Sequence, residues 1–196
     1  PSGLHRTRLK PRRLAQTLCC LDSQMSLTSK IEPYDPEWPK RFENAVQKLY
    51  PIFRTSLLSI HHVGSTAVIG LAAKPEIDIL IVVNSTKYCD YWTPELAHSG
   101  FVRGGDLSNG HLFYKRNVKG LRTHKIHVCI DGHKQIRAML AFRDLLTSNA
   151  SLREQYQELK LRQEQQNTAG IGEYLESKRP FIDEALKEAS IAQHDL

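Results

Sequence analysis

The sequence predicts an α+β domain in which a β-sheet is flanked by helices and followed by further helices at the C-terminus. Segments with strand character fall between residues 58 and 130, whereas everything after residue 131 has the apolar spacing of helices. Residues 77–83 form a β-branched run, which is typical of a strand buried on both faces. Strands that cluster early and helices that cluster late favour this fold class.

The first helix is predicted to begin near Asp35, which is a good N-cap, and Pro36, which suits the first helical position. Pro51 predicts the end of this helix, because proline interrupts helical hydrogen bonding. The apolar positions in between have helical spacing: Trp38, Phe42, Ala45, Val46 and Leu49.

Alternating apolar residues over 58–62 predict a short strand that ends at Gly64. Residues 68–75 are expected to form a tight turn or a single helical turn before the buried strand at 77–83. The remaining predicted elements are a helix over 86–99, a strand over 101–103, paired strands over 112–116 and 124–130, and helices over 134–148, 152–159 and 171–186.

Composition indicates a globular domain over residues 25–190. Hydrophobic residues make up 40% and charged residues 24% of the 196 positions, and no apolar run approaches the roughly 20 residues of a membrane span. Residues 1–18 carry five of the 27 Lys and Arg and no acid, so 22 basic residues remain against 21 acidic ones. This nearly neutral body weakens a nucleic-acid interpretation of the net charge of +6, without excluding a local patch.

Residues 1–24 lack apolar periodicity and are interpreted as a disordered basic tail or a non-native extension. Met25-Ser26-Leu27 resembles a natural translation start, which favours an extension, although an Arg-rich, acid-poor stretch is also typical of mitochondrial targeting segments. The four cysteines form no CxxC pair, so no structural zinc site is predicted and the protein is expected to be cytoplasmic, with reduced thiols.

One stretch carries the most informative chemistry. Glu76 and Asp78 are two apart at the start of a strand, so both side chains point to the same face. Two carboxylates in this arrangement can share Mg²⁺ or Mn²⁺, because Mg²⁺ favours one or two carboxylates together with waters and substrate phosphates. Gly64-Ser65 lets backbone N–H groups approach phosphate oxygens, and the hydroxyls of Ser65 and Thr66 are further donors.

Each of these features also has a structural explanation. A Gly-Ser turn is usually only a turn, and carboxylates two apart are usually solvated. Lys74 precedes a proline and could neutralise a phosphate or lie in solvent, with equal weight. The combination favours a site, because charges at one end of a buried strand need a partner or a function.

These residues resemble the GrpB family, whose hallmark reads roughly H-[IV]-G-S-T-A-V-P-G-L-x-A-K-P-x-I-D-I. The chain has HVGSTAVIGLAAKPEIDI from His62 to Ile79, with Ile69 where the family usually has proline. The resemblance covers about residues 31–188. Further matches are Tyr34-Asp35-Pro36-x-Trp38, Arg122-Thr123-His124-x-Ile126-His127-Val128, Phe142-Arg143-Asp144 and Lys178-x-x-Phe181-Ile182.

The resemblance implies a nucleotidyltransferase-like fold, with a mixed sheet flanked by helices. Active members of that superfamily use Gly-Ser, a carboxylate pair and a third carboxylate on a later strand. Here the later strand, 125–130, offers His127 where an acid is expected, which counts against two-metal nucleotidyl transfer. We expect residues 57–62, 77–83 and 125–130 to share one sheet, with Asp78 and His127 opening on the same cleft. His62 and His127 could converge with Asp78 on a transition metal, or both could be buried structural residues.

The expected function is binding of a nucleoside triphosphate with Mg²⁺ and transfer of its nucleotidyl group to an unidentified small-molecule acceptor. In this interpretation Glu76 and Asp78 are catalytic metal ligands, and His127 is an acid–base or positioning group. The expected phosphate- or substrate-binding residues are His62, Gly64, Ser65, Thr66, Lys74 and Arg122. The rival interpretation is a non-catalytic nucleotide- or coenzyme-binding module without the third carboxylate. Some GrpB relatives are fused to dephospho-CoA kinase, which by association implies a role near coenzyme A or nucleotide metabolism.

Overall fold

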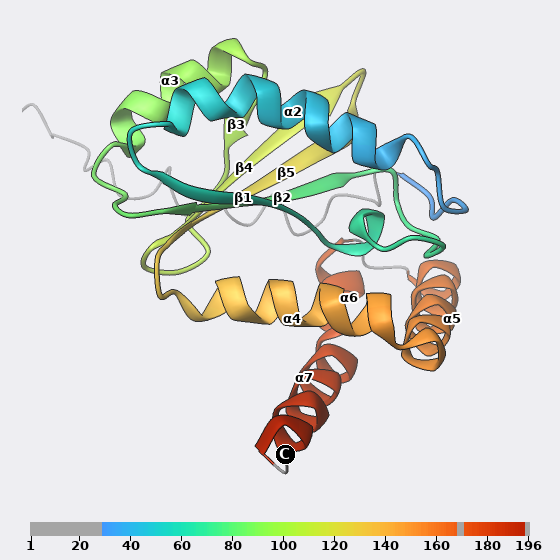
Figure 1. The fold of residues 1–196 in the computed structure, drawn as a ribbon. Helices are drawn as coiled ribbons and strands as arrows, with labels where there is room; N and C mark the ends of the chain where they lie inside the picture. The colour runs from blue at the N-terminus through green and yellow to red at the C-terminus, as the bar shows by residue number, and fades with distance from the viewer. Residues whose placement is uncertain (1–28, 168–170, 195–196) are drawn as a thin grey trace, which may run out of the picture.

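A five-stranded mixed sheet forms the centre of the molecule (Figure 1). The computed structural model describes residues 29–167 and 171–194. The strand order is β1-β2-β5-β4-β3, in which β2 and β5 run parallel and all other neighbours run antiparallel. The strands are β1 (Leu57–Val63), β2 (Ile77–Val83), β3 (Val102–Arg103), β4 (His111–Val118) and β5 (Leu121–Ile130).

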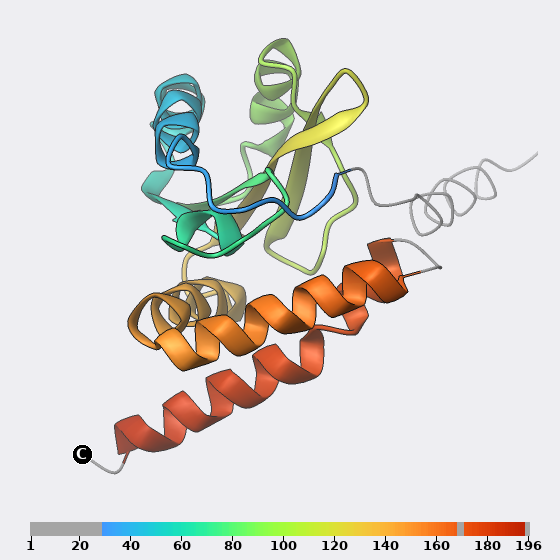
Figure 2. The same cartoon turned by 90° about the vertical axis from the view of Figure 1, so that its right-hand side faces the viewer.

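Helices cover both faces of the sheet (Figures 1 and 2). One face, called here the α2 face, carries α2 (Trp38–Phe53) and α3 (Cys89–His98). The other, called the α4 face, is covered by α4 (Lys134–Ser148). Beyond α4 lie α5 (Ala150–Gln166), α6 (Ile171–Glu176) and α7 (Arg179–His194). The expected α+β class, mixed sheet and C-terminal helices are therefore confirmed.

The strand β2 is buried on both faces, as its β-branched run predicted. Ile79 and Ile81 pack against the α2 side of the core, whereas Leu80 and Val82 pack against α4. All four are at most 5% exposed. Burying each such side chain contributes about 1.5–3 kcal/mol, so β2 anchors the sheet and gives the residues at its start a rigid support.

Two predicted helix boundaries differ from the structure. Asp35 caps the chain before α2, with its carboxylate accepting from the Glu37 N–H at 2.9 Å, but the helix begins only at Trp38. Pro51 lies inside α2 rather than ending it: proline removes one helical hydrogen bond, but Phe53 beyond it is fully buried and keeps the last turn in the core.

The single last helix predicted over 171–186 is wrong, because the chain breaks there into α6 and α7. The break is held by Ser177, whose carbonyl accepts from Gln163 of α5 at 2.9 Å. Its hydroxyl also donates to the Tyr174 carbonyl at 3.1 Å.

The prediction for residues 1–24 lies outside the described residues. Within the described part of the chain, no helix is long and apolar enough to cross a membrane.

Candidate functional site

The turn after β1 brings the backbone against Asp78. Val63 pairs with Asp78 in the β1–β2 ladder, and the chain then turns at Gly64 with a φ of 72°. A Cβ at Gly64 would lie 2.5 Å from an Asp78 carboxylate oxygen, too close for any side chain. Glycine is therefore required here both for the left-handed backbone and for the close approach of Asp78.

Lys125 joins the two carboxylates. It lies directly opposite Asp78 in the parallel β2–β5 ladder, so the two side chains share the α4 face. Its ammonium is 2.8 Å from a Glu76 carboxylate oxygen and 3.3 Å from one of Asp78. The Glu76 side chain is only 4% exposed, Asp78 is 19% exposed and Lys125 is 23% exposed. Glu76 and Asp78 thus point to the same face, as their spacing predicted, and the cation between them is the ammonium of Lys125.

Burial opposes charge on all three groups. For Lys125 the two carboxylates outweigh burial and raise the pKa of the ammonium. For Glu76 burial is outweighed by Lys125, together with Arg122 and Lys74, so the pKa falls below its usual value. For Asp78 burial prevails over Lys125 and the pKa is raised. Burial therefore disfavours the charged form of Asp78, whereas the neighbouring cations favour that of Glu76.

These residues do not fit a resident Mg²⁺ or Mn²⁺ ion. The ammonium of Lys125 stands where a metal shared by Glu76 and Asp78 would bind, and it neutralises one of their charges. The neighbouring strand supplies this lysine at the position facing Asp78, and His127, where a third carboxylate is expected, adds no acid. A divalent ion would have to displace Lys125 first.

A pocket rich in lysines lies over the carboxylates. We call it the lysine pocket, and its volume is about 80 Å³. Ser65 and Thr66 line it from the turn after β1, and α6 lines it with Tyr174 and Leu175. Its charged side chains are Lys74, Glu76, Asp78, Lys125, Lys160 and Lys178.

Three of these lysines form no ion pair within 4.0 Å among the described residues. Lys74 has a buried ammonium without a hydrogen-bond partner in that part of the chain, 4.3 Å from the centre of the Tyr174 ring. Lys178 lies 4.0 Å from the centre of the same ring. Lys160 is 2% exposed and donates to the carbonyl oxygen of Ala72. Burial lowers the pKa of Lys160 to about 7, and burial with the charges of Lys125 and Lys160 lowers the pKa of Lys178 to about 7.

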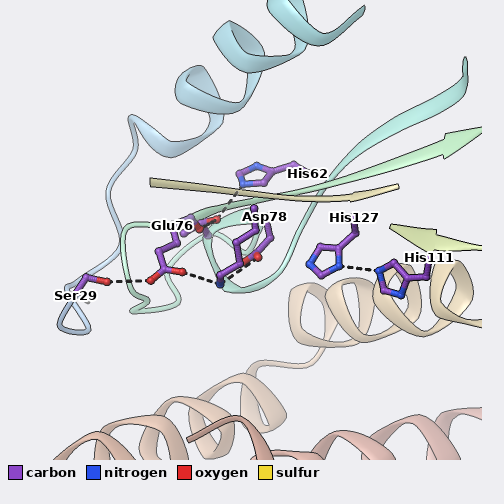
Figure 3. Close-up of polar contacts among 8 residues, drawn as sticks. Ser29, His62, Glu76, Asp78, His111 and His127 are labelled. Atoms are coloured by element: carbon purple, nitrogen blue, oxygen red, sulfur yellow. Dashed lines mark hydrogen bonds and ion pairs between the residues drawn. The ribbon is translucent and has the colours of Figure 1, made fainter. Parts of the chain in front are cut away.

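The helix α5 fixes one wall of the pocket. Ala72 donates its N–H to Gln157 at 2.8 Å and accepts from Lys160, so both of its backbone polar groups are held by α5. Tyr156 of the same helix hydrogen-bonds Ser65. On the opposite side, the hydroxyl of Ser29 donates to Glu76 at 3.2 Å (Figure 3). The C-terminal helices therefore form the lysine pocket together with the sheet and the turn after β1.

His62 does not converge with Asp78, which corrects the expected histidine–carboxylate cluster. It pairs with Ile79 in the ladder and so lies on the α2 face, where its ring stacks on that of Phe42 with the ring centres 4.7 Å apart. Its Nε2 is 3.1 Å from the Thr66 hydroxyl, whose own proton is donated to the Glu76 carbonyl. Burial, reinforced by Arg143, lowers the pKa of His62 to about 4. His62 thus supports the turn from behind rather than reaching the pocket.

His127 shares the α4 face with Asp78, as predicted, but does not line the lysine pocket. Its Nδ1 is 2.9 Å from Nε2 of His111 (Figure 3). Burial, with His111 and Lys125 nearby, lowers the pKa of His127 to about 3. The residue is therefore a neutral, half-buried neighbour of the site.

The other predicted residues occupy supporting positions. Thr66 lines the pocket but is 1% exposed, with its hydroxyl shared between His62 and the Glu76 carbonyl. Arg122 does not line the pocket, although its charge helps to lower the pKa of Glu76. Gly64 and Ser65 form the turn itself.

Three important residues were missed by the sequence argument: Lys125, Lys160 and Lys178. Lys178 and Lys125 each lie in a stretch that resembles the GrpB family, and that resemblance is the sequence feature that could have indicated them. Lys160 had none, because one lysine on a polar helix looks like any solvated side chain.

Comparison with known proteins places relatives across most of the chain. A family model described as GrpB protein matches residues 28–188. UPF0157 protein BH1888 from Halalkalibacterium halodurans is 34% identical over 158 residues, which is 80% of each chain. The crystal structure of conserved protein GrpB from Enterococcus faecalis superimposes with a TM-score of 0.75 at 32% identity, covering 82% of this chain and 96% of that one.

A longer relative carries a different name. Dephospho-CoA kinase from Mycolicibacterium paratuberculosis is 28% identical over 185 residues. The match covers 82% of this chain but only 46% of that protein, so the chain spans about half of the relative's length.

Proposed function

This chain belongs to the GrpB family, and from that premise we propose that its lysine pocket binds the phosphate groups of a nucleotide. The observation that carries the proposal is the charge balance of the pocket. Four lysines line it against two carboxylates, so the lining carries a net charge of +2 when all six groups are charged. This excess of positive charge faces the pocket, where an anion would balance it.

An excess of positive charge on partly buried lysines is costly, so the pocket is stabilised by a counter-charge. A di- or triphosphate supplies several oxygens that can each accept a charge-assisted hydrogen bond. Ser65 adds a hydroxyl at the same wall. Phosphate binding would also restore the full charge of Lys160 and Lys178, whose pKa values of about 7 leave them only partly protonated in the empty pocket.

The position of Lys125 favours a binding role over two-metal nucleotidyl transfer. His127 stands where the third carboxylate is expected, and Lys125, which faces Asp78, holds Glu76 and Asp78 in an ion pair. We therefore place the binding-module interpretation ahead of the transferase. Mg²⁺ or Mn²⁺ could enter with the nucleotide, on its phosphates, without using the carboxylates. Coenzyme A and dephospho-CoA are candidate ligands beside the nucleoside triphosphates, since a relative is named dephospho-CoA kinase.

The test is calorimetric titration of ATP, GTP, CTP, UTP, coenzyme A and dephospho-CoA into the full chain, with EDTA and separately with Mg²⁺. We expect at least one to bind in EDTA, and Lys178→Met to weaken that ligand roughly 10- to 150-fold, the equivalent of about 1.5–3 kcal/mol. Lys40→Met, at an exposed position on α2, is the matched control and should bind as the parent does.

Two results would contradict the proposal. If the parent binds none of these ligands under either condition, the pocket is not a nucleotide site. If binding appears only with Mg²⁺ and is lost in Asp78→Asn but not in Lys178→Met, the carboxylates hold a metal and the transferase interpretation gains instead.

A further inference from the structure

A second cavity lies on the α2 face, on the other side of the sheet from the lysine pocket. Its volume is about 180 Å³, and it opens between α2, the end of α3 and the strands β4 and β5. His124 of β5 pairs with Ile77, so its side chain is on the α2 face, whereas the adjacent Lys125 is on the α4 face. The two cavities are thus separated by the sheet itself.

Positive charge dominates this cavity. Its lining includes Arg41 and Lys48 from α2 and Arg116 from β4, and no carboxylate among the described residues lines it. Arg41 is positioned by Asp35 at 2.9 Å, but neither Lys48 nor Arg116 has an acidic partner within residues 29–167 and 171–194. Gly100, with a φ of 83°, leaves room for Arg116, since a Cβ there would lie 3.2 Å from its Nε.

His124 adds an acceptor among these donors. Its Nδ1 is 2.9 Å from the Thr123 hydroxyl, and that hydroxyl donates its own proton to the Arg116 carbonyl at 3.3 Å. Nδ1 of His124 must then carry the ring proton and donate it, which leaves Nε2 unprotonated as an acceptor. Burial and the charges of Arg116, Lys48 and Arg41 lower the pKa of His124 to about 4, so the ring stays neutral beside them.

Three cations and one neutral acceptor are the complement of an oxyanion that also carries an O–H group. Hydrogen phosphate has that combination, and so has a phosphate monoester whose organic part carries a hydroxyl, whereas sulfate has the charge without the proton. At roughly 30 Å³ for each water, the cavity could hold about six waters, enough for a phosphate with a short organic substituent. The buried ring of Phe101 forms an apolar part of the wall against such a substituent.

We propose that the cavity formed by Arg41, Lys48, Arg116 and His124 is a second anion site, which binds a small phosphate-bearing molecule and prefers it to sulfate. Arg41, Lys48 and Arg116 bind the phosphate oxygens, and Nε2 of His124 accepts a hydrogen bond from the ligand's O–H group. This site is independent of the nucleotide proposal, because it shares no residue with the lysine pocket.

The experiment is an NMR titration of the ¹⁵N-labelled full chain with inorganic phosphate, glycerol phosphate and sulfate in turn. The backbone amides of Gly100, Phe101 and His124 report this cavity, and those of Ser65 and Lys178 report the lysine pocket. We expect phosphate to shift the first group, with sulfate binding weaker on the order of tenfold. Glycerol phosphate binding more tightly than inorganic phosphate would assign the site to a monoester, and the reverse order would assign it to free phosphate.

Variants separate the site from its surroundings. Arg116→Gln and Lys48→Gln should each weaken phosphate on the order of tenfold at this cavity. His124→Phe should remove the preference over sulfate, and Lys40→Gln on the same helix should change nothing. Lys48 is exposed, so its variant keeps the test valid if Arg116→Gln does not fold. Phosphate shifts confined to the lysine pocket, equal binding of sulfate, or unchanged affinity in both cationic variants would each overturn the proposal.

Discussion

Replacing Lys125 with methionine removes the cation between Glu76 and Asp78 while keeping an unbranched side chain of similar length. In the parent, one ammonium lies 2.8 Å and 3.3 Å from the two carboxylates. In Lys125→Met the two carboxylates lose the nearest positive charge, and Glu76 is only 4% exposed to solvent. We therefore expect a clear loss of stability at neutral pH in metal-free buffer.

The magnitude follows from the burial of the group. Breaking a buried ion pair by removing one partner costs about 3–5 kcal/mol. Lys125 is 23% exposed, so water screens part of the charge and the lower end, about 3 kcal/mol, is the better expectation. For a chain of this size that corresponds to a fall of roughly 6–12 °C in Tm. Replacing the carboxylates as well, in Glu76→Gln/Asp78→Asn/Lys125→Met, should restore most of the loss.

Divalent metal should distinguish the variant from the parent. With Lys125 gone, Glu76 and Asp78 become a vacant carboxylate pair, and Mg²⁺ at ten times its Kd would return about 1.4 kcal/mol, or roughly 3–6 °C. The parent should not respond to Mg²⁺, because its own ammonium occupies that position. The assay is thermal unfolding with EDTA and with Mg²⁺, using Lys40→Met as the matched control.

The reasoning would be refuted if Lys125→Met lowered the free energy of unfolding by less than about 1 kcal/mol and if Mg²⁺ left its Tm unchanged. The stability of the two carboxylates would then not depend on Lys125. A parent that is itself stabilised by Mg²⁺ would show that a metal displaces the lysine.

Three further predictions test the surroundings of the site. Gly64→Ala should destabilise by more than about 1 kcal/mol in urea unfolding, because it needs a positive φ and meets Asp78 at 2.5 Å; a neutral effect would mean that the turn rearranges freely. Lys160 has a folded pKa of about 7, below its unfolded value, so its penalty on folding is fully present below pH 7 and is lost as pH rises towards the unfolded pKa. The parent should therefore gain stability relative to Lys160→Met between pH 7 and 9, and parallel urea curves for the two proteins would argue against a buried charge. His127 has a folded pKa of about 3, below its unfolded value, so stability should fall as pH drops below about 6.5 towards 3. In denaturant titrations His127→Gln should reduce this loss of stability at acid pH. The same loss in the variant as in the parent would mean that another group causes it.

Much of the fold follows from local patterns in the sequence. The β-branched run of β2 and the apolar spacing of α4 depend on neighbours along the chain, and both were predicted with the observed bounds. Helix ends were less predictable, because Pro51 is tolerated where Phe53 beyond it is buried, and burial is a tertiary property.

The sequence by itself also placed Glu76 and Asp78 on one face, since alternation along a strand needs no tertiary information. Which cation they share was decided by register. The parallel pairing of β2 with β5 puts Lys125 opposite Asp78 and His127 opposite Leu80. A shift of one residue in this register would have moved both side chains to the other face of the sheet.

Only the tertiary structure determines how the lysine pocket is assembled and on which face of the sheet His62 lies. Lys160 and Lys178 lie more than eighty residues beyond Asp78 in the sequence, and they reach the pocket because α5 docks on Ala72 and the chain breaks before α7. His62 alternates onto the α2 face because β1 pairs antiparallel with β2 in the observed register. A sequence pattern records which side chains share a strand face, but only packing between elements decides which charges meet.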